Sequence, residues 1–198
     1  VGQITDGIIL ALGDSLTAGL GLPAEQSYPA QLEKLLVEKG YQYKVVNSGV
    51  SGETSSGARS RIDWVMRMRP DIVILVTGAN DGLRGIDPEI LRDNLESIII
   101  TFREHDVAVV LAGMQMVTSL GADYVSAFNG VYPAVSSSHD VVYMPFFLEG
   151  VAAEPGLNRE DGIHPNSEGY AVIAANLLPY VEEAIARHEK KTDRPAGQ

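Results

Sequence analysis

The sequence predicts an α/β fold, a three-layer sandwich in which a mainly parallel five-stranded sheet lies between helices. Five short apolar runs recur along the 198 residues, and segments with helical periodicity separate them. Several runs are continuously apolar, which is typical of parallel strands covered on both faces. Alternating strands and helices also imply right-handed crossover connections.

The predicted strands are rich in Val, Ile and Leu, and each is short. They are Ile8–Leu12, Tyr43–Asn47, Ile72–Val76, Val107–Leu111 and Val141–Tyr143.

Helix signals lie between these runs. Ser27 can cap a helix that ends at Gly40, and residues 54–68 form a weaker helical segment because of an internal glycine. Asp87 and the proline after it provide an N-cap and a first helical position, so a helix is expected to follow.

Two later helices contain residues that interrupt helical hydrogen bonding. Gly130 and Pro133 interrupt the helix predicted over residues 121–138. Ser167 can cap a final helix, in which Pro179 is expected to cause a kink or a split.

Length and composition indicate one globular domain, expected over residues 1–187, with 188–198 as a flexible tail. Fifteen Lys and Arg against 26 Asp and Glu give a net charge of -11, which disfavours nucleic acid and anionic membrane surfaces as partners. Apolar runs are too short for a membrane span. Without cysteine or an HxxxH pair, no metal or other cofactor is expected.

Polar and glycine-rich motifs follow four of the predicted strands. In an open α/β sheet, ligands bind beyond the carboxyl ends of the strands, so these motifs should converge on one face. They are Gly13-Asp14-Ser15-Leu16, Ser48-Gly49-Val50-Ser51-Gly52-Glu53, Gly78-Ala79-Asn80-Asp81 and Asp161-Gly162-Ile163-His164-Pro165.

Together the four motifs contain the groups of a serine acyl-transfer site. Ser15 is a poor nucleophile until a base accepts its proton, and His164 is the histidine beside a strand-end motif. Asp161, three residues earlier, can turn back to orient the imidazole. Each motif alone also fits a helix cap, a turn or a solvated loop, so their conjunction carries the interpretation. The other histidines, His105, His139 and His188, are expected to be structural.

These four blocks, in this order, resemble those of the SGNH, or GDSL, hydrolase family over roughly residues 8–187. The resemblance implies a flavodoxin-like SGNH hydrolase fold with Ser15 as the nucleophile, His164 as the base and Asp161 as its orienter. It also implies an oxyanion hole built from the backbone N–H groups of Ser15 and Gly52 and the side-chain amide of Asn80.

Within the family, the sequence is most similar to the multifunctional bacterial acyl-CoA thioesterases, lysophospholipases and arylesterases. The similarity lies in residues 48–54, 80–85 and 145–147. That group usually has a Pro-Asn element after the fourth strand, where residues 116–121 differ. Sugar O-deacetylation, also found in the wider family, stays an alternative.

Apolar side chains in two loops are expected to line an acyl groove and to favour medium-chain esters, although Met and Phe are commonly buried in cores. The candidates are Met114, Met116, Val117, Leu120, Phe146, Phe147, Leu148 and Val151. The expected partner is therefore a small acyl ester or thioester.

Other functions fit the motifs less well. Residues around Ser15 lack the Gly-x-Ser-x-Gly elbow of α/β-hydrolases. An aspartyl phosphotransferase using Asp14 usually has a second acidic residue where Leu16 stands, and residues 19–21 lack the third glycine of a dinucleotide fingerprint. A non-catalytic binding module also stays open. From the resemblance and the first residue, Val1, a periplasmic or secreted location is expected, with the cytoplasm as alternative.

Overall fold

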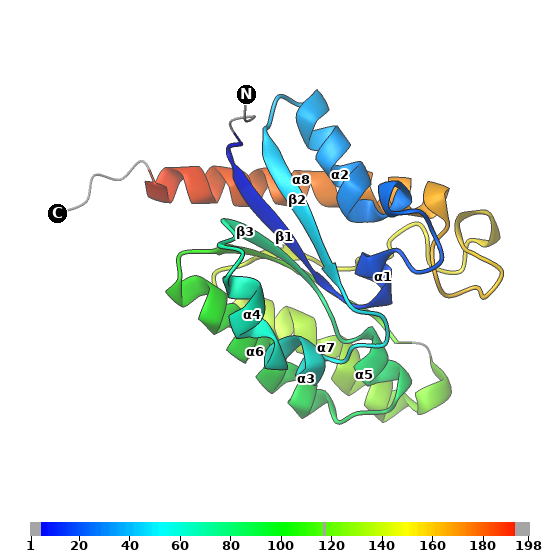
Figure 1. Cartoon of the computed structure of the whole chain (residues 1–198). Coiled ribbons are helices and arrows are strands. Elements are labelled where there is room, and N and C mark those ends of the chain that lie inside the picture. Colours follow the sequence, from blue (N-terminus) through cyan, green and yellow to red (C-terminus); the bar gives the residue numbers. More distant parts are fainter. Residues whose placement is uncertain (1–4, 117, 193–198) are drawn as a thin grey trace.

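The computed structural model describes residues 5–116 and 118–192, and a five-stranded parallel sheet forms the centre of this part of the chain (Figure 1). The strand order is β2-β1-β3-β4-β5, and each neighbouring pair is parallel. The strands are β1 (Gly7–Gly13), β2 (Tyr43–Gly49), β3 (Ile72–Val76), β4 (Ala108–Ala112) and β5 (Val142–Met144). The predicted fold class and all five predicted strands are confirmed, with ends that differ by one or two residues.

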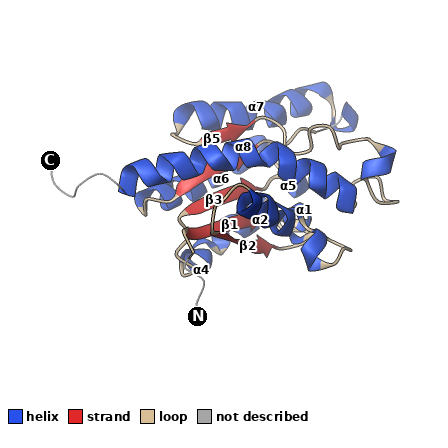
Figure 2. Ribbon diagram, turned by 90° about the horizontal axis from the view of Figure 1, so that it is seen from above, coloured by secondary structure: helices blue, strands red, loops and turns tan. Residues whose placement is uncertain are grey.

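Helices cover both faces of the sheet, which explains the continuous apolar runs. Every residue of β3 is buried. Figure 2, seen from above, shows α8 crossing over the strands with α2 beside it, and Figure 1 places the other long helices on the opposite face. The first layer contains α2 (Tyr28–Glu38) and α8 (Ser167–Thr192), and the second contains α3 (Ser55–Ser60), α4 (Ile62–Met66), α6 (Pro88–Glu104) and α7 (Ala122–Ser138).

The helix starts show which capping predictions were correct. Asp87 caps α6 as predicted, because its carboxylate accepts the N–H of Glu89 at 3.0 Å. Ser27 stands at the N-cap of α2 but makes no cap bond, since its hydroxyl donates to the carbonyl of Ala24. Asn166 rather than Ser167 caps α8, by accepting the N–H of Gly169 at 2.9 Å.

Two helices predicted to be interrupted by proline are each continuous in the structure. Helix α7 continues through Pro133 and α8 through Pro179. Each proline removes one internal hydrogen bond, but the buried faces of both helices pack against the core, and tertiary packing supplies most helical stability. The expected weak segment at 54–68 divides instead at Arg61, between α3 and α4.

Residues 188–192, predicted as part of a flexible tail, are helical instead, and the rest of the predicted tail, 193–198, lies outside the described residues. Helix α8 extends to Thr192, and the His188 side chain, 15% exposed, lies with Nε2 3.6 Å from a carboxylate oxygen of Asp71. The amphipathic pattern therefore continues past residue 187, because its inner face still meets the sheet. Within residues 5–116 and 118–192, no helix combines the length and apolar character required to span a bilayer.

Candidate active site

A tight turn after β1 presents Ser15 at the edge of the sheet. Asp14 is the N-cap of the short helix α1 (Ser15–Ala18), and its Oδ1 accepts the N–H of Leu16 at 3.0 Å. Gly19 ends the helix with φ +75°, a conformation that glycine adopts without strain. Ser15 is therefore fixed at the first position of a helix, 9% exposed.

The loop between β5 and α8 brings a histidine and an aspartate to this serine. Ser15 Oγ and His164 Nε2 are 3.0 Å apart, and His164 Nδ1 lies 2.9 Å from Asp161 Oδ2. The other oxygen of Asp161 accepts the N–H groups of Ile163 and His164, each at 2.9 Å. These backbone donors, together with the imidazole, hold the pKa of Asp161 well below its usual range.

The geometry of this loop determines the tautomer of His164. An ionised Asp161 can only accept hydrogen bonds, so the proton of the neutral imidazole resides on Nδ1. Nε2 then carries a lone pair directed at the Ser15 hydroxyl. This arrangement can accept a proton from Ser15 and return it to a leaving group.

Donors for a developing negative charge surround Ser15. Among the described contacts, the backbone N–H groups of Ser15 and Gly52 have no intramolecular acceptor. Asn80, in the short helix α5 (Ala79–Leu83), donates from Nδ2 to the carbonyl of Glu53 at 2.9 Å and to Asp14 Oδ2 at 3.2 Å. Both partners are acceptors, which fixes the amide nitrogen on this side.

Asp14 is a buried carboxylate beside the nucleophile. It is 1% exposed, and this burial raises its pKa to about 6, partly offset by the Leu16 N–H. The charge of nearby Glu53 raises the pKa further, whereas His164 lowers it. The sequence analysis gave Asp14 a role only as the nucleophile of a phosphotransferase, which was disfavoured. Its contact with Asn80 joins residues that are far apart in the sequence, so only the folded structure shows it.

An apolar cavity of about 360 Å³ opens onto these groups. Apart from the polar groups described above, Ser51 and Gln115, its walls are aliphatic or thioether side chains. Three of them, Leu20, Leu83 and Ile163, are also 41%, 57% and 55% exposed, so the mouth of the cavity is apolar. The apolar lining consists of Leu16, Leu20, Ala79, Leu83, Met114, Met116, Leu148 and Ile163.

Half of the predicted groove residues lie elsewhere. Met114, Met116 and Leu148 line the cavity, and Val117 falls outside the described residues. The remaining four do not line the cavity, which corrects the prediction for them. The loop after β5 turns back into the core, and Leu120 lies in a separate 3-10 turn (Thr118–Leu120). Phe147 is fully buried with its ring 5.2 Å from that of Tyr28, Val151 is buried, Phe146 lines a different groove beside Pro179, and Leu120 does not contact the cavity.

The other histidines make local contacts away from this cavity. His105 Nδ1 lies 2.8 Å from the carbonyl of Thr101, and His139 Nε2 lies 3.9 Å from Glu96. Within the described ranges, no three His, Asp or Glu side chains are grouped so that they could hold a metal ion.

Comparison with known proteins gives consistent similarities along most of the chain. Residues 11–172 match the GDSL-like Lipase/Acylhydrolase family. Esterase TesA of Pseudomonas aeruginosa is 39% identical over 178 residues, 89% of either chain. Thioesterase 1/protease 1/lysophospholipase L1 of Escherichia coli K12 is 34% identical over 84% of this chain and 79% of its own. The crystal structure of AlinE4, an SGNH-hydrolase family esterase, has a TM-score of 0.77 at 37% identity, covering 93% of this chain and 98% of its own.

Proposed function

Because the chain belongs to the GDSL-like lipase/acylhydrolase family, we propose that it hydrolyses carboxylic esters and thioesters of acyl chains through an acyl-enzyme on Ser15. The observation that carries the proposal is the chain of contacts from Ser15 Oγ to His164 at 3.0 Å and on to Asp161 at 2.9 Å, at the wall of an apolar cavity.

Acylation begins when Ser15 Oγ attacks the ester or thioester carbonyl carbon and its proton passes to His164 Nε2. The carbonyl oxygen becomes an oxyanion, which the N–H groups of Ser15 and Gly52 and the amide of Asn80 stabilise. The weaker Asn80 contact, at 3.2 Å to Asp14, supplies the hydrogen that the oxyanion shares. Ionised Asp161 stabilises the imidazolium that forms.

The tetrahedral intermediate collapses when His164 returns the proton to the leaving oxygen or sulfur, and the alcohol or thiol departs. A water molecule then gives its proton to His164 and attacks the acyl carbon. Collapse of this second intermediate releases the acid and returns the proton to Ser15. No net proton or charge is stored in the enzyme.

The cavity walls favour an acyl chain over an acetylated sugar. Apart from the groups that take part in the reaction, the lining has few polar side chains, and Gln115 is one of them. Eight lining residues are apolar. A sugar needs several hydrogen-bonding partners, while each buried methylene contributes about 0.8 kcal/mol in an apolar groove. Sugar O-deacetylation is accordingly the weaker function.

A fluorophosphonate probe tests the proposal directly. It should label Ser15 alone and abolish turnover of p-nitrophenyl esters, because the probe needs an activated nucleophile. Ser15→Ala should remove both labelling and turnover while leaving the circular dichroism spectrum unchanged. Esterase activity that survives in Ser15→Ala, or labelling of another serine, would contradict the assignment.

A panel of substrates tests the acyl class. Acetyl, butyryl, hexanoyl and octanoyl p-nitrophenyl esters should show kcat/KM that rises with chain length until the cavity is filled. An acyl-CoA and a lysophospholipid extend the panel to the two other leaving groups. Equal rates for acetyl and octanoyl esters, or reaction with acetylated sugars only, would favour the deacetylase function.

A further inference from the structure

A largely buried guanidinium links three segments that surround the nucleophile. Arg61 stands between α3 and α4, and its side chain is 16% exposed. Nε and Nη2 donate to the two carboxylate oxygens of Glu53 at 2.6 and 2.8 Å. Nη1 donates to Ser48 Oγ at 2.7 Å, and Nη2 also approaches the carbonyls of Ser48 at 2.7 Å and Gly13 at 3.3 Å.

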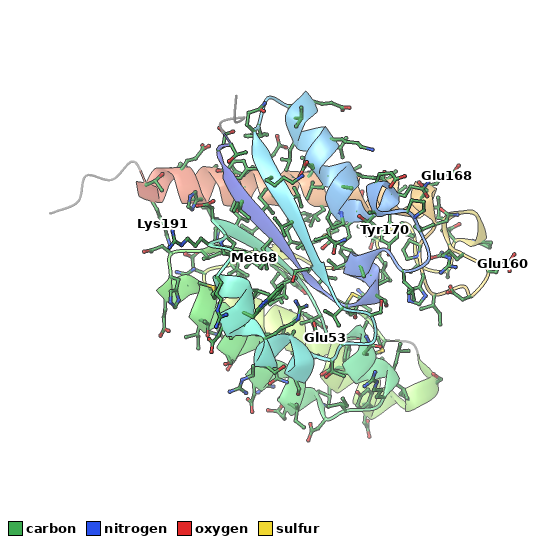
Figure 3. The ribbon with its side chains drawn as sticks, in the orientation of Figure 1. Glu53, Met68, Glu160, Glu168, Tyr170 and Lys191 are labelled. Atoms are coloured by element: carbon green, nitrogen blue, oxygen red, sulfur yellow. The ribbon has the colours of Figure 1, made fainter. Side chains whose placement is uncertain are left out.

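These partners lie in the chain segments that carry the proposed oxyanion donors. Gly13 is the last residue of β1, directly before the turn that carries Ser15. Ser48 lies near the end of β2, and Gly52 and Glu53 follow in the next loop. Figure 3 labels Glu53 in this loop. The backbone carbonyl of Glu53 accepts the amide of Asn80 at 2.9 Å, so the same loop also fixes the third donor.

The local sequence makes room for this ion pair. A Cβ atom at Gly57 would lie 2.7 Å from Glu53 Cγ, so a larger residue there would displace the carboxylate. Glu53 itself is 7% exposed. Burying two charges brings little stability relative to apolar residues of similar size, so stability alone does not explain the pair. A planar guanidinium does fix several acceptors in one geometry.

We infer that Arg61, through Glu53, Ser48 and Gly13, is a positioning residue that holds the oxyanion donors in place. This inference rests on the proposed hydrolase function. Arg61 does not line the cavity, so a substrate bound there is not expected to touch it. Its effect is therefore on the donors that meet the oxyanion, and it should influence the transition state more than substrate binding.

The main test replaces both charges with apolar side chains of similar size, in the double variant Arg61→Met/Glu53→Met. Removal of a buried ion pair as a unit is commonly neutral for stability, so the protein should fold. Arg61→Lys retains the charge and loses the two-pronged contact. Arg67→Lys is the matched control, because Arg67 is exposed at the other end of α4.

Steady-state kinetics on a p-nitrophenyl ester and inhibition by an alkyl boronic acid separate positioning from a structural role. The boronate forms a tetrahedral anion on serine and so depends on the oxyanion donors. We expect kcat and boronate affinity to fall together by about 10²-fold in the double variant, with KM changed by less than about threefold. Arg61→Lys should show a smaller loss of the same kind, and Arg67→Lys should match wild type.

The outcomes separate this inference from the proposed function. If wild type neither turns over esters nor reacts with a fluorophosphonate at Ser15, the hydrolase proposal itself fails. If wild type is active and the folded double variant keeps its kcat and boronate affinity, only the role of Arg61 is overturned. If the double variant does not fold, Arg61→Lys is the test. A rise in KM as large as the fall in kcat, or no fall in kcat, contradicts the inference.

Discussion

The buried carboxylate of Asp14 contacts Asn80. The charge of this carboxylate should lower the free energy of unfolding by an amount that depends on pH. Burial raises its pKa from the ordinary 3.8 to about 6. The native state therefore binds this proton more tightly than the unfolded chain, so wild type gains stability from Asp14 as the pH falls through 6 towards 4. At about 1.36 kcal/mol per pKa unit, the shift amounts to about 3 kcal/mol.

The substitution Asp14→Asn removes the titration and keeps the side-chain shape. Altered hydrogen bonds to Leu16 and Asn80 add an offset that does not vary with pH. The free energy of unfolding of the variant minus that of wild type should therefore decrease by about 2.4 kcal/mol between about pH 8 and about pH 4, the rest of the shift appearing below the unfolded pKa of 3.8. Most of the change should occur below pH 6.

Urea unfolding followed by circular dichroism at five pH values gives this difference. Ionisable groups that do not interact with Asp14 titrate alike in both proteins, so their effects cancel in the subtraction. Glu53 and His164 interact with the Asp14 charge and belong to the measured difference. A difference that stays constant within about 0.5 kcal/mol over the whole range would refute the argument that Asp14 is a buried charge in the native state.

Three further changes test other parts of the site. Asn80→Ala should lower kcat by about 10²–10³-fold with little change in KM, and a defect in KM alone would mean that the amide binds substrate instead. Asp161→Asn should greatly reduce kcat without unfolding the protein, because an amide favours the wrong imidazole tautomer; unchanged turnover would reassign the orienting role. Phe147→Ala should destabilise the fold by about 3–5 kcal/mol in chemical unfolding, since the ring is fully buried, whereas Phe146→Ala should cost clearly less.

The strands and the reacting groups were predictable because they follow from local rules. Parallel strands covered on both faces are continuously apolar, and polar motifs directly after them meet at one edge of the sheet. Ser15 and Asn80 lie at such positions, whereas the Asp161–His164 pair lies later, in the loop between β5 and α8. The structure brings all of them together beside one cavity.

The cavity walls and the ion pair were less predictable, because they depend on how loops return to the sheet. Phe147 enters the core because the segment after β5 turns inward. Leu20, just after α1, and Leu83, the last residue of α5, line the mouth of the cavity. The signal that could have found them is an apolar residue shortly after a strand-end motif. Arg61 and Gly13 are 48 residues apart, and no sequence motif predicts that they meet.

The two halves of the site are supported differently. Ser15 and Asn80 are in short helices at the ends of buried strands, whereas Asp161, with its side chain 40% exposed, belongs to a surface loop closed by the bridge between Asn158 and Pro165. Opening of that loop alone would carry His164 away from Ser15 and leave the core intact. Loss of activity on mild heating is thus expected as a reversible local event that precedes global unfolding, with the loop setting the working temperature range of the enzyme.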